Sequence, residues 1–414
     1  MKSILFSHPT GSTMARESLK ALQDKGYLYA YFTSLGFSSQ SWLYRYGLPS
    51  FLKRKLSNRT YALSPKALKT HFFPEALRLL CQQMGFASFV EHEVGHFCAD
   101  AIFQHHDNRV SEWLQRQAAL PQARAVYGYE DSCLKTFQAA KKGGIQCIYE
   151  LPIAYWHTAQ AILKEEAKRY PEWEATLLGN RDSALKNERK TQELGLADLI
   201  LCPSDFVKQS LPKAMLDKTP VAVVPYGGPC IAPRTTVPPL SKKLRFLFAG
   251  SLTQRKGLAD IFEAFKILNR SDIELICLGA PLLPLSFYQQ QYAHFQWESP
   301  RSNAAIIQFM KSCHVLILPS LVEGRAIVQL EALACGLPII ITQHTGGADL
   351  VDSHKTGLIV PIRSPHKIAE AITWFADHRH LLPELQDACI QKARDHSWEA
   401  FRQNLIRAID TQLN

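Results

Sequence analysis

The chain has 414 residues, of which 46% are hydrophobic and 20% charged, and its formal net charge is +10. This length accommodates two domains with cores of their own, and the composition excludes a disordered or low-complexity protein. No apolar run approaches the roughly 18 residues of a membrane-spanning helix. The opening MKSILFSHPTGS is too weakly charged and too briefly apolar for a secretory signal, so we expect a cytoplasmic protein with reduced cysteines.

Short apolar runs that alternate with helical patterns fill the first half of the chain. Runs of this kind, rich in Val, Ile and Leu, are typical of parallel strands that helices cover on both faces. The expected strands are residues 3–8, 27–34, 124–129, 146–151, 199–204 and 221–226. They predict a first doubly wound, Rossmann-like domain over 1–232, in which ligands would lie beyond the carboxyl ends of the strands.

A basic and aromatic segment follows the second expected strand. Residues 45–78 include eight Lys or Arg and one acidic residue, with the run Lys53-Arg54-Lys55 among them. Basic and aromatic side chains together suit the surface of an anionic membrane. A solvated basic face with its aromatic rings turned to the core is the alternative. No zinc-finger or RNA-binding signature accompanies the segment, so we do not expect a nucleic-acid partner.

Residues 92–96 read His-Glu-Val-Gly-His, the pattern with which zinc peptidases place two histidine ligands one helical turn apart. On a helix that begins near Phe86, His92 and His96 would face away from the apolar stripe. Further candidate ligands lie along the same predicted helix: His105, His106 and Glu112. Because a helix cannot fold back to close such a site, we expect an ordinary polar helix face and no metal. A zinc hydrolase is the alternative.

A proline-rich stretch divides the chain. GGPCIAPRTTVPPLSKK has prolines at 229, 233, 238 and 239, a density that neither strands nor helices tolerate. We therefore predict a linker over 233–243. The strand pattern then resumes at 244–250, 273–279, 315–320, 337–342 and 357–361. It predicts a second Rossmann-like domain over 244–390, and a helix over 391–414 that packs back on the first domain.

Two strand-to-helix turns in the second domain carry the most information. In FLFAGSLTQRKGLADIFEAF, a buried strand ends in small residues, and Arg255 and Lys256 stand before a helix, where cations can neutralise a diphosphate. In the other turn, Glu323 precedes a helix expected from about 326 to 334, and Glu331 lies within it. At about 1.5 Å per residue the two carboxylates are on the order of 12 Å apart. That span suits the two ends of a sugar nucleotide.

These stretches resemble the group 1 (GT4) retaining glycosyltransferases, whose GT-B fold has two Rossmann-like domains facing across a cleft. Glu323 through Glu331 matches the family's E-x7-E motif and leads into EALACGLPII, and Gly250 through Gly257 matches its G-s-l-x-x-R-K-G turn. HTGGADLVDSHKTGLIVP and, in the first domain, ELGLADLILCPSDFVKQSL resemble further family segments. The resemblance covers most of the chain and is densest between residues 244 and 361.

The resemblance implies transfer of a hexosyl group from a nucleoside-diphosphate sugar to a hydroxyl of a glycan or lipid-linked acceptor, with retention of configuration and with neither metal nor other cofactor. Arg255 and Lys256 would stabilise the departing diphosphate, Glu323 would contact the donor sugar, and Glu331 would hold the ribose. The other implied donor contacts are Gly11, Gly250, Ser251, Gly324, Arg325, Ala326 and Ile327. With a lipid-linked acceptor, segment 45–78 would place the protein at the inner face of the membrane.

Departures from the family pattern leave other functions open. The family's E-G-F-G reads Glu323-Gly324-Arg325-Ala326 here, and the cleft histidine of many relatives has no counterpart after strand 146–151. Candidates for that place, each of which could equally be structural, are Glu150, Tyr155 and His157. The alternatives on the same fold are a sugar-nucleotide epimerase, a glycosyl phosphorylase and a non-catalytic scaffold. A nicotinamide-dependent enzyme is disfavoured, since no G-x-G-x-x-G follows any strand.

Overall fold

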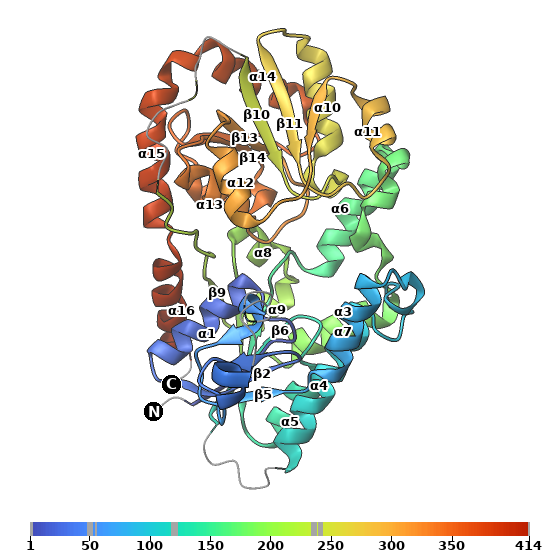
Figure 1. Ribbon diagram of the computed structural model, residues 1–414, viewed down its shortest axis with the longest axis vertical. Coiled ribbons are helices and arrows are strands. Elements are labelled where there is room, and N and C mark those ends of the chain that lie inside the picture. Colours follow the sequence, from blue (N-terminus) through green and yellow to red (C-terminus); the bar gives the residue numbers. More distant parts are fainter. Residues whose placement is uncertain are drawn as a thin grey trace.

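The computed structural model of the chain describes residues 3–47, 53, 56–116, 123–232, 238 and 243–412. Two α/β domains are stacked along the long axis, with the C-terminal domain above the N-terminal one in Figure 1. The predicted linker 233–243 lies outside the described residues except for Pro238 and Lys243, and so do Arg54 and Lys55 of the basic run.

The N-terminal sheet has seven parallel strands in the order β5-β2-β1-β6-β7-β8-β9. Side chains of successive residues point to opposite faces, so Ile4 and Phe6 pack with helices α1 and α16, whereas Leu5 packs with α4 and α5. The strands are β1 Ile4–Ser7, β2 Leu28–Thr33, β5 Leu68–Thr70, β6 Ala125–Tyr129, β7 Gln146–Glu150, β8 Leu199–Cys202 and β9 Val221–Val223, beside the short pair β3 Phe37–Ser38 and β4 Thr60–Tyr61. The helices are α1 Thr13–Asp24, α3 Phe73–Gln83, α4 Ala99–Arg116, α5 Leu134–Lys142, α6 Trp156–Arg169, α7 Ala184–Gly195, α8 Asp205–Ser210 and α9 Lys213–Lys218.

The C-terminal sheet has six parallel strands in the order β12-β11-β10-β13-β14-β15. Its central strands are built from apolar residues that are buried on both faces, so one large core surrounds the sheet. The strands are β10 Leu244–Ala249, β11 Ile273–Leu278, β12 Phe295–Glu298, β13 Val315–Leu318, β14 Ile339–Ile341 and β15 Gly357–Ile359. The helices are α10 Leu258–Leu268, α11 Leu285–Gln291, α12 Asn303–Met310, α13 Ile327–Ala334, α14 Pro365–Asp377, α15 Leu382–Asp395 and α16 Trp398–Gln412.

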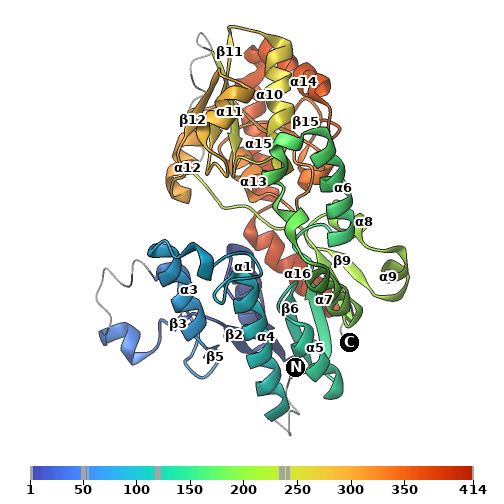
Figure 2. The same cartoon turned by 90° about the vertical axis from the view of Figure 1, so that its right-hand side faces the viewer.

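The two domains exchange elements. Helix α16 runs from the C-terminal domain down to α1 of the N-terminal domain (Figure 1). In the opposite direction, α6 and the 3-10 turn Pro171–Thr176 lie beside the C-terminal domain (Figure 2). Trp173 in this turn is fully buried in the C-terminal core, where its ring packs against those of Phe287 and Tyr288. Residues that precede the linker in sequence thus complete the core of the domain that follows it.

The helix predicted from Phe86 is wrong. Residues 87–89 form a 3-10 turn, residues 90–98 are turns and bends, and α4 begins only at Ala99. The chain folds back on itself here, because the N–H of Phe97 donates to the carbonyl of Phe89 at 2.8 Å and Glu93 has a φ of 58°. Gly95 permits this, since a Cβ at that position would lie 2.5 Å from the Phe89 carbonyl oxygen. The apolar spacing therefore belongs to a tight turn and not to a helix.

Candidate functional site

A cluster of three charged side chains lies where strands β10 and β13 end. The Lys256 Nζ is 2.5 Å and the Arg255 Nη1 is 3.0 Å from the same Oε1 of Glu323. Burial alone would raise the pKa of Glu323, but the two cations outweigh it and hold the pKa below its ordinary value. The carboxylate is therefore ionised at neutral pH, and the cluster carries one net positive charge.

Glycines shape the turn that carries the two cations. Gly250, directly after β10, has a φ of 145°, and a Cβ there would lie 3.0 Å from the aliphatic part of the Lys256 side chain. Gly257 has a φ of 78°, and its Cβ would lie 2.3 Å from the carbonyl oxygen of Pro319 at the end of β13. Glycine is needed at both positions for conformation and for space. The exposed Ser251 lies on the outer side of this turn.

The second carboxylate of the E-x7-E motif lies in α13. Glu331 is only 8% exposed, and one of its oxygens accepts a hydrogen bond from the Asn303 amide nitrogen at 2.6 Å. Burial raises its pKa, and the bond from Asn303 opposes that shift. Asn303 is the first residue of α12, and no pattern in the sequence marks it as a partner of Glu331. An oriented carboxylate with a free oxygen suits a pair of hydroxyl donors.

Arg325 does not extend toward the Glu323 cluster, as a donor-binding side chain would. Its guanidinium is almost fully buried and holds both oxygens of Asp349, at 2.7 and 3.0 Å. The same group donates to the carbonyl oxygens of Gly346 at 3.0 Å and of Tyr226, in the N-terminal half, at 2.9 Å. The Arg325 side chain thus joins the two domains, and the expected contact of its backbone with the donor stays a prediction.

The neighbours of Arg325 are also at the domain contact. A Cβ on Gly324 would lie 1.7 Å from the carbonyl oxygen of Pro152, and the Gly324 carbonyl accepts a hydrogen bond from the Ser204 hydroxyl at 2.7 Å. The Ala326 N–H donates to the carbonyl of Thr345 at 3.3 Å, and the side chain of Ile327 packs on the N-terminal core. That their backbone meets a phosphate or a sugar stays a prediction.

The first loop of the N-terminal domain is held by a neutral histidine. His8 Nδ1 accepts hydrogen bonds from the N–H groups of Gly11 at 2.8 Å and Thr10 at 3.2 Å. Burial, together with the nearby Arg59, lowers the pKa of His8 to about 3, so Nδ1 stays available as an acceptor. Gly11 has a φ of 64°, and a Cβ on it would lie 1.9 Å from the Tyr61 hydroxyl. The structure thus fixes this loop but joins Gly11 to no residue of the Glu323 cluster among those described.

The three candidates for the missing cleft histidine lie in different surroundings. Glu150 ends β7 and is buried, and it accepts hydrogen bonds from the hydroxyls of Tyr127 at 2.5 Å and Tyr226 at 2.6 Å. Burial raises its pKa to about 7 despite these two bonds. Tyr155 is buried and its hydroxyl pairs with that of Thr191 at 2.9 Å, whereas His157 is exposed on the first turn of α6. Glu150 is therefore the candidate with unusual electrostatics.

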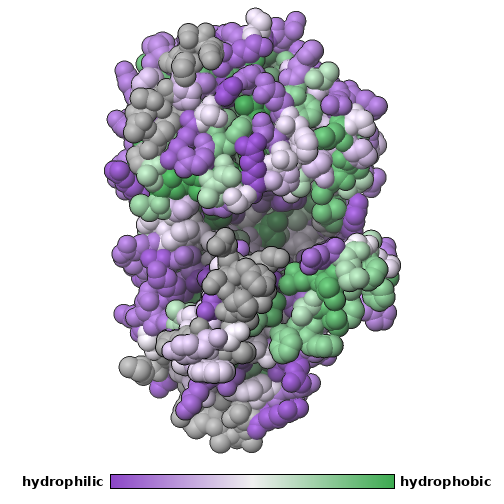
Figure 3. Space-filling view, viewed as in Figure 1, coloured by the Kyte–Doolittle hydropathy of each residue, from purple (hydrophilic) through white to green (hydrophobic). Residues whose placement is uncertain are grey.

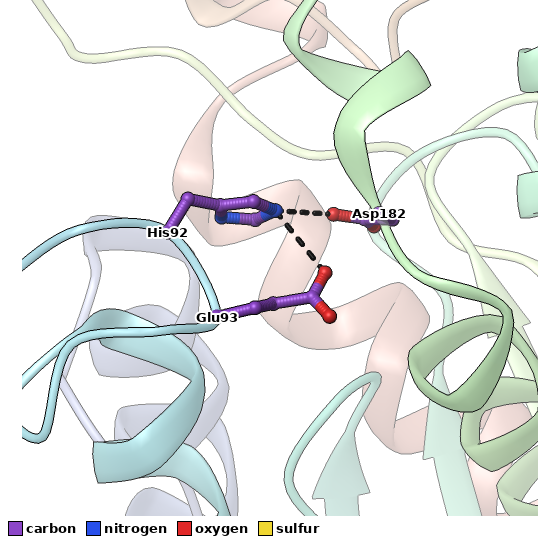
Figure 4. Close-up of side chains that lie close together, drawn as sticks. All are labelled: His92, Glu93 and Asp182. Atoms are coloured by element: carbon purple, nitrogen blue, oxygen red, sulfur yellow. Dashed lines mark ion pairs between the residues drawn. The ribbon is translucent and has the colours of Figure 1, made fainter.

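The His-Glu-Val-Gly-His motif does not assemble as a zinc peptidase would require, because residues 92–96 are not helical. His92 Nε2 instead lies 3.1 Å from Asp182 and 3.2 Å from Glu93 (Figure 4). This is the one group of potential metal ligands among the described residues, and it lacks His96. Asp182 already pairs with two lysines at 2.9 Å, Lys186 and Lys190, and Glu93 accepts the Ser183 N–H at 3.0 Å. These contacts give the motif a structural role at the amino end of α7.

Between the domains, on the face shown in Figure 3, the surface is hollowed. The loops after β10 and β13 lie at this junction, since Gln254 contacts Thr176 and Gly324 contacts Pro152. All ten cysteines are free thiols and nine are buried, as their scattered positions predicted. No helix among the described ranges combines the length and the apolar character needed to cross a bilayer.

Comparison with known proteins identifies the C-terminal domain. The model of the family described as glycosyl transferases group 1 matches residues 236–396. An uncharacterized glycosyltransferase of Methanocaldococcus jannaschii is 24% identical over 213 residues, 49% of this chain and 56% of that protein. The putative colanic acid biosynthesis glycosyltransferase WcaL of Escherichia coli is 26% identical over 226 residues, 50% and 54% respectively. The D-inositol 3-phosphate glycosyltransferase of Corynebacterium glutamicum is 27% identical over 167 residues, 37% and 40%. The matched part of this chain thus covers at most 56% of the length of these relatives.

Solved structures show the fold. A sucrose-phosphate synthase from Thermosynechococcus elongatus aligns with a TM-score of 0.66 at 13% identity and covers 99% of both chains. A UDP-forming trehalose-phosphate synthase from Burkholderia xenovorans aligns at 0.63 and 13%, over 100% of both. Anabaena HepE in complex with UDP aligns at 0.60 and 13%, over 99% of this chain and 100% of the other. The chain has the GT-B fold that the sequence predicted, with two Rossmann-like domains.

Proposed function

Because residues 236–396 place the C-terminal domain among the group 1 glycosyl transferases, we propose that the protein transfers a hexosyl group from a nucleoside-diphosphate sugar to a hydroxyl acceptor, a glycan or a lipid-linked molecule. The observation that carries the proposal is the shared contact of Arg255 and Lys256 with one oxygen of Glu323. It holds two cations and a carboxylate together at a glycine turn, where strands β10 and β13 end.

In the proposed reaction the two cations stabilise the negative charge that develops on the departing diphosphate. A diphosphate competes with Glu323 for them, and the carboxylate that it displaces then accepts hydrogen bonds from the hydroxyls of the donor sugar. Glu331, held by Asn303, accepts bonds from the ribose hydroxyls. With these side chains supplying the positive charge, the reaction requires no metal. Retention of configuration is the outcome that the resemblance to the GT4 family implies.

The structure weakens one argument for a non-catalytic scaffold. Arg325, which replaces the phenylalanine of the family's motif, suggested from sequence that the donor site had drifted. Its guanidinium is used entirely at the domain seam, by Asp349 and two carbonyl groups. The substitution therefore changes how the domains meet and leaves the Glu323 cluster intact.

A thermal-shift panel tests the donor site. A ligand present at a hundred times its dissociation constant stabilises the folded state by about 2.7 kcal/mol, so UDP, GDP or ADP should raise the Tm of the protein selectively. Lys256→Ala and Glu331→Ala should abolish the rise. Lys266→Ala is the matched control, because Lys266 is an exposed lysine on α10 that pairs with its neighbour Glu263. An equal rise in Lys256→Ala and wild type, or none with any diphosphate, would sink the proposal. For the reaction itself, NMR of the product's anomeric proton reads out retention.

A further inference from the structure

Helix α3 and the turn after it expose an unusual number of large apolar side chains. Phe73, Leu80 and Met84 fall on one face of the helix, with Phe73 67% and Leu80 50% exposed. We call this surface the apolar ledge; its members are Phe72, Phe73, Leu79, Leu80, Met84, Phe86, Phe89 and Val94. In Figure 3 hydrophobic side chains gather continuously over this region, directly beside the hollow between the domains. Contiguous apolar surface of this kind on a folded domain marks a contact site.

The ledge is held rigidly in its outward position. On the inner side of α3, the fully buried Glu75 receives Arg59 and Arg78, each at 2.7 Å. The turn beyond α3 is fixed by the bond from the Phe97 N–H to Phe89 and by the cap that Glu93 provides for the Ser183 N–H. The apolar side chains therefore project from a built support and do not belong to a loose loop that could bury them.

The charges of residues 25–90, which include most of the ledge, are almost all of one sign. Residues 25–90 contain nine Lys or Arg, and the only acidic residue among them is Glu75, which is buried and paired with two arginines. This segment thus accounts for a net charge of +8, nine minus one, out of the +10 of the chain, and exposes no carboxylate. Acidic residues adjoin both ends of this segment: Asp24 precedes it, and the exposed Glu91 and the half-buried Glu93 lie between Phe89 and Val94 of the ledge.

We propose that the apolar ledge inserts into the headgroup region of an anionic bilayer, while Lys66 and Lys69, which precede it in the chain, contact the lipid phosphates. Apolar side chains combined with a large excess of basic over acidic ones are the composition of an interfacial membrane anchor. A second copy of the chain fits less well. In a symmetric dimer the same patch meets itself, which would bring two segments of +8 together.

Binding to a bilayer would fix the orientation of the protein on the membrane. Because the ledge borders the hollow, a docked molecule would hold its interdomain junction against the membrane surface. A lipid-linked acceptor could then reach the Glu323 cluster without leaving the bilayer. This last step rests on the proposed function, but binding to a bilayer does not, so the two can fail separately.

Flotation with vesicles tests the inference. The full chain should co-float with vesicles of phosphatidylcholine and phosphatidylglycerol, and much less with phosphatidylcholine alone. The double variant Phe73→Ser, Leu80→Ser should lower the vesicle partition coefficient about tenfold or more, because burial of both apolar side chains favours the membrane-bound state. Ile267→Ser, at a 47% exposed position on α10 of the C-terminal domain, is the matched control and should bind as the wild type does.

Two further arms separate the sources of binding. Lys66→Gln, Lys69→Gln should reduce the preference for phosphatidylglycerol, and the nucleotide-induced Tm rise should be the same in all these variants. Unchanged flotation of Phe73→Ser, Leu80→Ser would overturn the insertion of the ledge. The proposal would also be overturned if the wild type floated with neither kind of vesicle and light scattering showed a dimeric wild type and a monomeric double variant. The ledge would then be an interface between two copies of the protein.

Discussion

Arg325→Phe restores the phenylalanine of the family's E-G-F-G motif, and we expect it to destabilise this protein. The arginine side chain is 1% exposed and makes four hydrogen bonds, two of them to Asp349 and two to backbone carbonyls. Phenylalanine can make none of them. It would leave the carbonyls of Tyr226 and Gly346 without their donor in a buried seam.

The expected magnitude follows from what is left unpaired. Removing one partner of a buried ion pair costs about 3–5 kcal/mol. The lower end applies here, because the Asp349 side chain is 41% exposed and keeps His396 at 3.2 Å. We therefore expect Arg325→Phe to lower the free energy of unfolding by about 3 kcal/mol. Arg325→Lys keeps the positive charge but loses the planar guanidinium, so its free energy of unfolding should lie between those of Arg325→Phe and the wild type.

Urea unfolding followed by circular dichroism and by tryptophan fluorescence measures this difference, provided that the two signals change together.

The dependence of stability on pH adds a second readout. Burial would raise the pKa of Asp349, but hydrogen bonds from His396 and Arg325 hold it well below its ordinary value of 3.8. A depressed carboxyl pKa stabilises the folded state above 3.8, and that stability is lost as the pH falls below it. The gap between wild type and Arg325→Phe should therefore narrow in acid. An Arg325→Phe protein with wild-type stability that no longer binds a nucleotide would refute the reasoning and return Arg325 to the donor site.

Three further predictions concern buried groups outside the donor cluster. Trp173→Ala should lower the free energy of unfolding by about 3–5 kcal/mol. Trp42→Ala, at an exposed position, should change it by less than about 0.5 kcal/mol. Equal effects of the two substitutions would mean that the buried contact of Trp173 does not stabilise the association of the domains. Burial raises the pKa of Glu150 from 4.5 to about 7, so the folded state retains a proton in that window and stability should fall as the pH rises through it. Urea midpoints of Glu150→Gln should lack this slope, and a slope equal to that of the wild type would assign it to another group. A chelator should leave the Tm unchanged, because lysines already pair with Asp182; a fall that zinc reverses, and that His92→Ala abolishes, would make the cluster of Figure 4 a metal site.

The spacing of apolar residues in the sequence predicted the strands whose side chains are buried in the two sheets. All eleven predicted strands are present, because each is a run of apolar residues; most are buried on both faces of a doubly wound sheet, and the edge strands β9 and β15 are partly exposed. The strands that were missed are the edge strands β5 and β12 and the short pair β3 and β4. The first two include Lys69 and Glu298 and the other two have two residues each, so none carries an apolar run. The false helix at Phe86 has the apolar period but is broken by the backbone approach at Gly95, which depends on contacts that spacing does not encode.

The candidate site likewise has residues whose proximity the sequence could predict and residues whose partners it could not. Arg255, Lys256 and Glu323 could be predicted to lie together, because the carboxyl ends of neighbouring parallel strands meet at one edge of the sheet. The partners of Glu331 and Arg325 could not. Asn303, at the start of α12, and Tyr226, in a loop, lie 28 and 99 positions away from them in the chain. Only the packing of the whole molecule brings such distant segments together.

The seam that Arg325 closes also bears on how the donor cluster is held. Glu323 precedes Gly324, whose backbone touches Pro152, and Arg255 follows Gln254, whose N–H donates to Thr176. The Glu323 end of the cluster is thus attached, within one residue, to the N-terminal domain, whereas the turn that carries Thr176 belongs to the C-terminal core. Opening the domains would pull on the contact of Gly324 with Pro152, and the contacts of the carboxylate with the two cations would lengthen with it. Residues that hold the seam should therefore influence the donor site without touching it, and the double variant Arg325→Lys, Trp173→Phe should weaken nucleotide binding more than the sum of its single substitutions.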